Sequence, residues 1–212
     1  MLSNAKEQLL HYGREMIARG LTTGSGGNLS LYLRPMNRFV ITPSGMEYNA
    51  ITAADLLVCD DQGRVVEGHR RPSSELGFHL ALYHHRPEIG AVVHTHSVYA
   101  TTLACLHREI PPVHYLVGFA GHKVPLAPYA TFGTPALATA ITDAIGDSNA
   151  LLMANHGLVA VGQDLPTAFN VAEEIEFVAR IYYQTLVAGS PQLLTKAQMD
   201  EALVKFKSYG RQ

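Results

Sequence analysis

The chain has 212 residues, a formal net charge of -2 and a pI near 6.6, which together give no general attraction to nucleic acid or to anionic membranes. Hydrophobic residues make up 47% and charged residues 16%, as in an ordinary globular protein long enough to bury a sizeable core. The sequence contains neither a run of about 20 apolar residues nor the basic and apolar regions of a signal peptide. We therefore expect a single cytoplasmic domain, residues 1–212, that binds a small molecule rather than nucleic acid or a membrane.

The first third of the chain combines one helix with two hairpins. Apolar residues at helical spacing predict a helix that ends at Gly20. Turn residues between β-prone runs then predict paired strands at residues 29–33 and 38–42, and again at residues 56–59 and 64–67. These hairpins indicate antiparallel pairing.

Two loops in this region are rich in small and hydroxyl-bearing residues. Residues 22–28 include three glycines, whose backbone amides can approach an anion closely. Residues 42–45, Thr-Pro-Ser-Gly, form a second turn of this kind. Either loop alone is also typical of a plain chain reversal, so each is a candidate anion site only beside further evidence.

A helix should begin at Glu75, because apolar residues recur at helical spacing after it and Pro87 closes the segment. The amides of its first turn have no partner within the helix. Together with the hydroxyls of Ser73 and Ser74, these amides favour binding of a phosphate or a carboxylate.

His94 and His96 follow an apolar run, residues 90–93, that predicts a buried strand. Residues two apart on a strand point to the same face, so both imidazoles can bind one metal ion. His156 follows a later apolar strand and can supply a third ligand, and Glu75 a fourth, if the elements converge. Spacing alone leaves that convergence open. Three imidazoles and a carboxylate suit four-coordinate zinc.

The other histidines and the two cysteines show no pattern of this kind. Apolar neighbours favour buried free thiols over a disulfide at Cys59 and Cys105. Eight histidines lack a matching partner in the predicted elements, so we expect structural roles for His11, His69, His79, His84, His85, His107, His114 and His122.

The second half of the chain should contain four helices and four short strands. Capping residues and apolar spacing predict helices at residues 97–107, from residue 135, at residues 166–187, and after a capping box of Thr195 and Gln198. Apolar runs predict strands at residues 113–117, 123–126, 150–154 and 158–161.

Ordered motifs spread nearly from end to end resemble those of the class II aldolase and epimerase superfamily. They are residues 24–28 (GSGGN), 41–45 (ITPSG), 72–75 (PSSE), 94–96 (HTH), 110–115 (IPPVHY), 127–133 (APYATFG), 155–158 (NHGL) and 205–210 (KFKSYG). The resemblance implies an α/β fold with a mainly antiparallel central sheet between helix layers, as in the adducin head. It also implies a homotetramer with sites between subunits.

The resemblance further implies roles for single residues. One zinc ion per subunit is held by His94, His96 and His156, with Glu75 as a ligand that leaves to act as acid and base. The substrate phosphate is bound by Gly27, Asn28, Ser44, Gly45, Ser73 and Ser74. At the aldehyde end, Tyr115 from a neighbouring subunit is the acid and base, and the aromatic lining is Phe132, Phe206 and Tyr209.

The implied reaction is the reversible aldol cleavage of a ketose 1-phosphate. L-fuculose 1-phosphate would give dihydroxyacetone phosphate and L-lactaldehyde, and 5-deoxyribulose 1-phosphate is a related substrate. Alternatives within the superfamily are a methylthioribulose 1-phosphate dehydratase, a sugar-phosphate 4-epimerase and a non-enzymatic adducin-like module. The chain has no acidic residue between Glu109 and Asp143, where the epimerase uses an aspartate, and it keeps all four metal-ligand residues that the binding modules lose.

Overall fold

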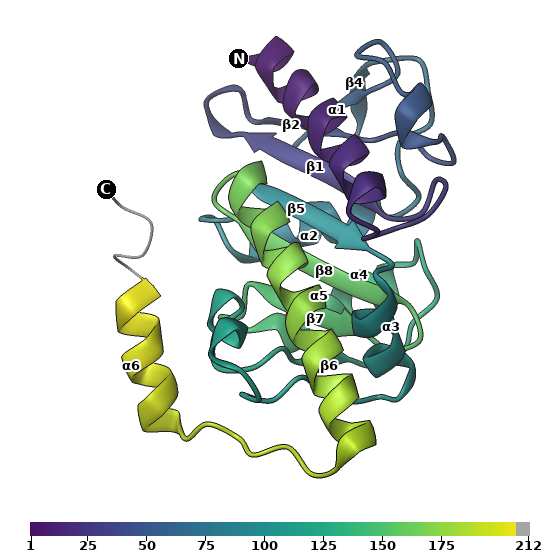
Figure 1. Cartoon of the computed structure of the whole chain (residues 1–212). Helices are drawn as coiled ribbons and strands as arrows, with labels where there is room; N and C mark the ends of the chain where they lie inside the picture. Colours follow the sequence, from purple (N-terminus) through teal and green to yellow (C-terminus); the bar gives the residue numbers. More distant parts are fainter. Residues whose placement is uncertain (207–212) are drawn as a thin grey trace.

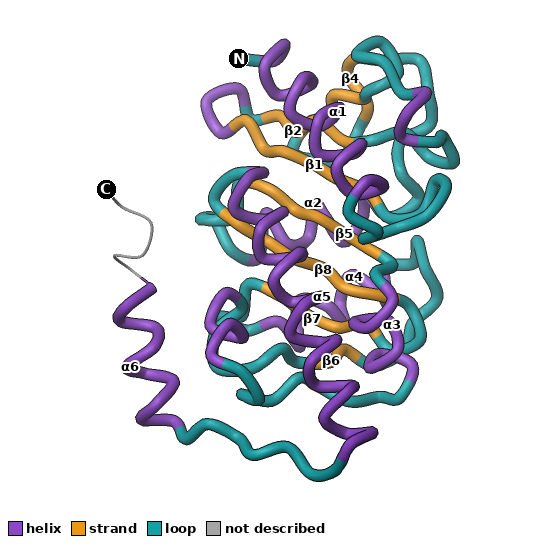
Figure 2. Tube along the Cα trace, viewed as in Figure 1, coloured by secondary structure: helices purple, strands orange, loops and turns teal. Residues whose placement is uncertain are grey.

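The computed structural model describes residues 1–206, and these form a sheet with helices on both faces (Figures 1 and 2). The strand order is β4-β3-β2-β1-β5-β8-β7-β6. β6 runs parallel to β7, and the other neighbouring strands pair antiparallel. The strands are β1 (Asn28–Leu33), β2 (Arg38–Ile41), β3 (Leu57–Asp60), β4 (Val65–Glu67), β5 (Ala91–Thr95), β6 (Leu126–Ala127), β7 (Ala150–Met153) and β8 (Gly157–Gly162). The predicted fold class is confirmed.

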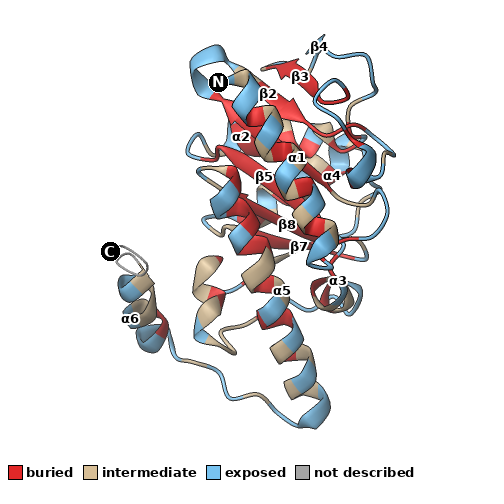
Figure 3. Ribbon diagram, turned by 45° about the horizontal axis from the view of Figure 1, so that its top comes forward, coloured by how far each residue is buried: buried red, intermediate tan, exposed pale blue. Residues whose placement is uncertain are grey.

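The helices divide between the two faces of the sheet. One face packs against α1, α3 and α5, and the other against α2 and α4, so the sheet separates two apolar cores. Figure 3 shows the central strands buried beneath these helices. The helices are α1 (Leu2–Ala18), α2 (Leu76–His85), α3 (Val98–Cys105), α4 (Pro135–Ile145), α5 (Leu165–Ala188) and α6 (Lys196–Phe206), with 3-10 turns at Arg34–Met36, Tyr48–Ala50 and Tyr115–Phe119.

Strand β1 illustrates how alternation assigns side chains to the two cores. Leu29 and Leu31 point toward α1 and α5, whereas Tyr32 joins the core under α2. Asn28 and Ser30 share the face of Tyr32, and both are buried polar residues. A polar stripe therefore runs along β1 on the side that α2 covers.

The C-terminal part of the chain follows the predicted caps. Helix α5 begins beside Pro166, and the Asp164 carboxylate accepts a hydrogen bond from the Thr167 amide at 2.8 Å. The capping box before α6 is present, since the Thr195 amide donates to the Gln198 side-chain oxygen at 2.8 Å. Helix α6 stands apart from the sheet in Figure 1 and contacts the 3-10 turn Tyr115–Phe119.

Three sequence predictions differ from the structure. Residues 113–117, predicted as a strand, enter the Tyr115–Phe119 3-10 turn. The apolar side chains there recur at helical rather than alternating spacing. Residues 123–126 form mainly a single bridge between Ile110 and Val124, ahead of the two-residue strand β6. Cys59 is buried as predicted, but Cys105 is exposed at the end of α3.

Within residues 1–206, no helix is both long enough and apolar enough to span a membrane.

Gly90 marks a tight approach between strands and gives a test of the fold. A methyl group there would strike the backbone carbonyl of Gln163, so Gly90→Ala should lower the free energy of unfolding by about 1–3 kcal/mol. Gly77 in α2 has open space around it, and Gly77→Ala should raise stability by about 0.5–1 kcal/mol. Urea unfolding of both variants checks this contrast, and equal stability of the two would contradict the register around Gly90.

Candidate active site

Three imidazoles meet beside the ends of the central strands β5 and β8. His94 lies near the end of β5 and His96 just after it, and their Nε2 atoms are 3.0 Å apart. His156 comes from the turn between β7 and β8, with its ring centroid 4.8 Å from that of His94. One nitrogen from each ring lies within 4.8 Å of the others. The three predicted metal-ligand histidines therefore converge.

The Glu75 carboxylate reaches the same cluster from the start of α2. Its Oε2 lies 3.2 Å from His94 Nε2, and its Oε1 lies 3.3 Å from His156 Nε2. Oε1 is buried without a hydrogen-bond partner, whereas Oε2 accepts a hydrogen bond from Asn28 Nδ2 at 2.9 Å. The arrangement brings the fourth predicted ligand to the three histidines.

The hydrogen bond on the far side of His94 sets its tautomer. His94 Nδ1 lies 3.0 Å from the carbonyl oxygen of Leu158, and a carbonyl can only accept, so Nδ1 carries the proton. In a neutral ring Nε2 then holds a lone pair, which faces the negative Oε2 of Glu75. A cation between these atoms removes the repulsion, and a backbone carbonyl behind a histidine is typical of metal ligation. The donor set fits a divalent metal.

The local electrostatics favour the metal-binding protonation states. Burial raises the pKa of Glu75, but positive charge at His94 and His156 and the hydrogen bond from Asn28 outweigh burial and lower that pKa to about 2. Burial, followed by the neighbouring imidazoles, lowers the pKa of His96 and of His156 to about 4. Near neutral pH His96 and His156 are therefore neutral, the form of imidazole that binds metal, and a cation among the rings would replace their positive charge in keeping Glu75 ionised.

A cavity of about 340 Å³ opens beside the cluster. Two turns that wall it are tied by backbone hydrogen bonds, from the Ser44 amide to the Arg71 carbonyl at 3.0 Å and from the Ser73 amide to the Thr42 carbonyl at 3.1 Å. All six residues predicted to bind phosphate line this cavity, namely Gly27, Asn28, Ser44, Gly45, Ser73 and Ser74. Its described lining has no Lys or Arg, so apart from the imidazoles of His96 and His156 its hydrogen-bond donors are amides and hydroxyls.

The glycine-rich loop of the cavity lies directly against β5. Gly27 has φ +70°, a left-handed conformation, and a methyl group there would strike the His94 carbonyl oxygen. The loop can therefore pass over the metal-ligand strand only with glycine at this position. This contact places the loop that lines the cavity directly against the strand that carries His94.

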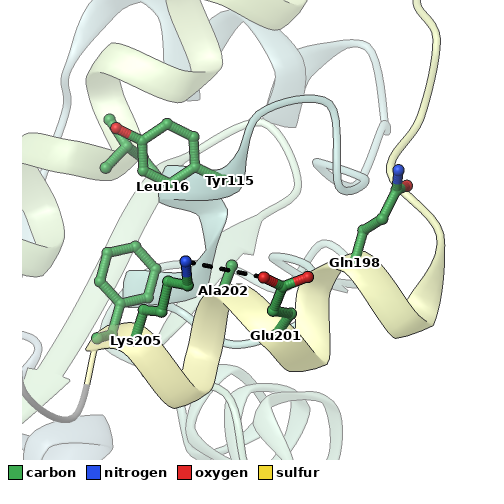
Figure 4. A pocket seen from close by; sticks show the side chains of 7 residues that line it. Tyr115, Leu116, Gln198, Glu201, Ala202 and Lys205 are labelled. Carbon is green, nitrogen blue, oxygen red and sulfur yellow. Dashed lines mark ion pairs between the residues drawn. The ribbon is translucent and has the colours of Figure 1, made fainter.

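The aromatic residues predicted for the aldehyde end are divided. Phe132 lines the same cavity as Glu75 and is 65% exposed. Tyr115 and Phe206 instead line a second cavity of about 380 Å³ under α6 (Figure 4), and their rings stack 6.2 Å apart. Tyr209 lies outside the described residues. Within this chain Tyr115 and Phe206 do not line the cavity that contains Glu75.

The structure adds one histidine that sequence reasoning set aside. His79, expected to be structural, is fully buried one helical turn after Glu75, with Nε2 2.5 Å from Asn28 Oδ1. Burial lowers its pKa to about 3. Its spacing of four residues from Glu75 on one helix face was the available signal.

Most of the chain matches a known protein family. Residues 7–183 match the family described as class II aldolase and adducin N-terminal domain. The chain is 48% identical over its whole length, and over all of the relative, to a 5-deoxy-D-ribulose 1-phosphate aldolase of Bacillus thuringiensis serovar kurstaki. It is 41% identical to an L-fuculose phosphate aldolase of Haemophilus influenzae, over 92% of this chain and 90% of the relative.

A solved L-fuculose 1-phosphate aldolase has a TM-score of 0.95 to this structure and 43% identity, covering 97% of both chains. The match extends over far more than half of the chain, and the resemblance inferred from the sequence motifs is confirmed. The chain belongs to the class II aldolase and adducin N-terminal domain family.

Proposed function

We propose that the protein is a metal-dependent aldolase that reversibly cleaves a deoxyketose 1-phosphate to dihydroxyacetone phosphate and an aldehyde, with residues 1–212 acting as one domain. The observation that carries this proposal is the junction of Glu75 and three imidazoles with a cavity of hydroxyls and amides. The names of the relatives support the reaction class, since they are aldolases of sugar phosphates.

We propose zinc as the resident metal, bound by His94, His96 and His156 with Glu75 as the fourth ligand. Three imidazoles and a carboxylate are a common ligand set for four-coordinate zinc. When bound, the metal supplies a Lewis acid that stabilises negative charge on a substrate oxygen. The rest of the chemistry belongs to side chains of the protein.

The phosphate of the substrate is proposed to lie against the two tied turns and the glycine-rich loop. Hydroxyls of Ser44 and Ser73 and the Gly27 amide are donors that suit phosphate oxygens. This binding orients the neighbouring carbonyl toward Glu75. Positioning of this kind lowers the barrier because the reacting groups no longer have to find each other.

Glu75 is proposed to move a proton at the carbon beside the substrate carbonyl. Contact with His94 and His156 holds the pKa of Glu75 at about 2, against the opposing effect of burial. If the carboxylate turns away from the imidazoles, burial remains and raises its pKa toward the range of a general base. The Oε1 atom, buried without a hydrogen-bond partner, is the atom available for this proton.

The aldehyde end is proposed to be completed by another copy of the chain. Tyr115 is 51% exposed and lies at a different cavity from Glu75, so a neighbouring subunit of a homotetramer would have to bring its Tyr115 to the site. Phe132 lies at the Glu75 cavity already. We also propose that the protein is cytoplasmic, because free thiols such as that of Cys59 persist in a reducing compartment.

The substrates to compare are 5-deoxyribulose 1-phosphate and L-fuculose 1-phosphate. Purified protein should release dihydroxyacetone phosphate from at least one of them, measured with a coupled reductase, and a zinc chelator should stop the release. His94→Ala should abolish both bound metal and cleavage, because it removes the most buried ligand. A folded, metal-loaded protein that releases no dihydroxyacetone phosphate from either would refute the proposed reaction.

Metal retention should depend on pH in a direction set by the imidazoles. The pKa values of His96 and His156 lie near 4 rather than at the ordinary 6.5, so protons compete with the metal only as pH falls toward 4. Metal content after dialysis should therefore stay constant from pH 8 to about 6 and fall below about 5. A half-loss near pH 6.5 would contradict this prediction.

Mixed oligomers can test whether the site is shared between copies. Glu75→Gln and Tyr115→Phe should each lower turnover by about 100-fold or more, because each removes a proton-transfer group. When the two variants are unfolded together and reassembled, a site needs Glu75 from one copy and Tyr115 from its neighbour. About a quarter of the sites in a mixed ring meet that condition, so activity should return to about a quarter of wild type. Mixtures no more active than the separate variants would mean that one chain supplies both groups.

A further inference from the structure

A chain of buried hydrogen bonds leads from Glu75 into the core under α2. Asn28 Nδ2 lies 2.9 Å from Glu75 Oε2, and Asn28 Oδ1 lies 2.5 Å from His79 Nε2. His79 Nδ1 lies 2.6 Å from Ser30 Oγ, which in turn lies 2.5 Å from the Tyr83 hydroxyl. Asn28, Ser30, His79 and Tyr83 are all buried, so their polar atoms are shielded from water and need partners within the protein.

The carboxylate at one end fixes the direction of every donor in this chain. An ionised carboxylate only accepts, so Asn28 must turn its amide nitrogen toward Glu75 and its oxygen toward His79. His79 must then donate from Nε2. The ring is fully buried, which disfavours its charged form, so it is neutral, its Nδ1 accepts from the Ser30 hydroxyl, and Ser30 accepts from Tyr83.

The His79 proton in turn constrains the orientation of Asn28 and, through Asn28, the position of the Glu75 carboxylate. If the Asn28 amide were flipped, its oxygen would face the Glu75 carboxylate. The cavity proposed to bind an anion would then lose an N–H donor. The Nε2 proton of His79 favours the opposite orientation, in which one amide proton holds Glu75 Oε2 and the other is left for a ligand in the cavity that Asn28 lines. Glu75 Oε1 then remains without a hydrogen-bond partner.

We infer that His79 is a positioning residue, which holds the Asn28 amide in the orientation that restrains Glu75 Oε2 and leaves Oε1 to move the proton. This inference rests on the proposed aldolase function, and it assigns a role to a residue outside the lining of the cavity. A purely structural histidine would need only to fill space and satisfy its own nitrogens. His79 Nε2 instead lies against Asn28, a side chain that both donates to the Glu75 carboxylate and lines the cavity.

Two amide variants of matched polarity separate these roles. In His79→Gln the amide nitrogen can occupy the place of Nε2 and still donate to Asn28. In His79→Asn the shorter side chain reaches only the Ser30 end. We expect His79→Asn to lower kcat by about tenfold, the effect of losing about 1.4 kcal/mol in the transition state, with metal content unchanged. We expect His79→Gln to stay within about threefold of wild type.

Equal loss of kcat in both variants, or no loss in either, would overturn the inference. Urea unfolding of the two variants shows whether they differ in stability, and a structural role would make the loss of activity follow the loss of stability. The rescue by glutamine, with kcat rather than metal content as the affected quantity, is what positioning predicts.

A second measurement needs neither a variant nor activity. Nitrogen-15 NMR of wild-type protein should show His79 as the neutral tautomer with its proton on Nε2. A proton on Nδ1 alone would reverse the Asn28 amide and overturn the inference. If the wild-type protein cleaves no ketose phosphate, the proposed function fails by itself, and the tautomer still decides whether the hydrogen-bond chain has the inferred direction.

Discussion

The site depends on a carboxylate that is buried against atoms carrying lone pairs. Glu75 is 6% exposed, and its two oxygens face Nε2 of His94 and Nε2 of His156. Burial alone would favour the neutral acid, whereas positive charge at the imidazoles and the hydrogen bond from Asn28 favour the carboxylate. The Asn28 amide on one side and a cation among the imidazoles on the other are what make this arrangement tolerable. The proposed metal binding and the proposed proton transfer at Glu75 would both depend on this balance of charge.

The antiparallel register of the sheet is what creates the balance. Asn28 on β1 stands opposite His94 on β5, and Thr95 on β5 stands opposite Leu158 on β8. These pairings put the Asn28 amide beside Glu75 and the Leu158 carbonyl behind His94. A shift by one residue would turn the His94 side chain to the opposite face of the sheet. The apolar residues of the two cores, which set the register, therefore set the ligand geometry as well.

The periodicity of the sequence could predict only those features of the site that lie within a single strand or helix. His94 and His96 share a face because strands alternate, and the start of α2 at Glu75 follows from apolar spacing. The convergence of His156 could not be derived from spacing, since it depends on how β8 pairs with β5. The family motifs supplied that step. His79 was set aside although it lies four residues after Glu75, because its partner Asn28 is on a distant strand, and only the pairing of the polar stripe of β1 with α2 reveals the contact.

The two ends of the site are built differently, and this difference bears on substrate choice. The turns around Ser44 and Ser73 are tied to each other by backbone hydrogen bonds, so the anion end is rigid within one chain. The other end has Phe132, 65% exposed, and lacks the separately placed Tyr115. The relatives are named for sugars that share a 1-phosphate and differ in the remaining carbons. A rigid end would suit the proposed binding of the shared phosphate, whereas the proposed aromatic end could change with the sugar while the histidine cluster and its hydrogen bonds stay constant.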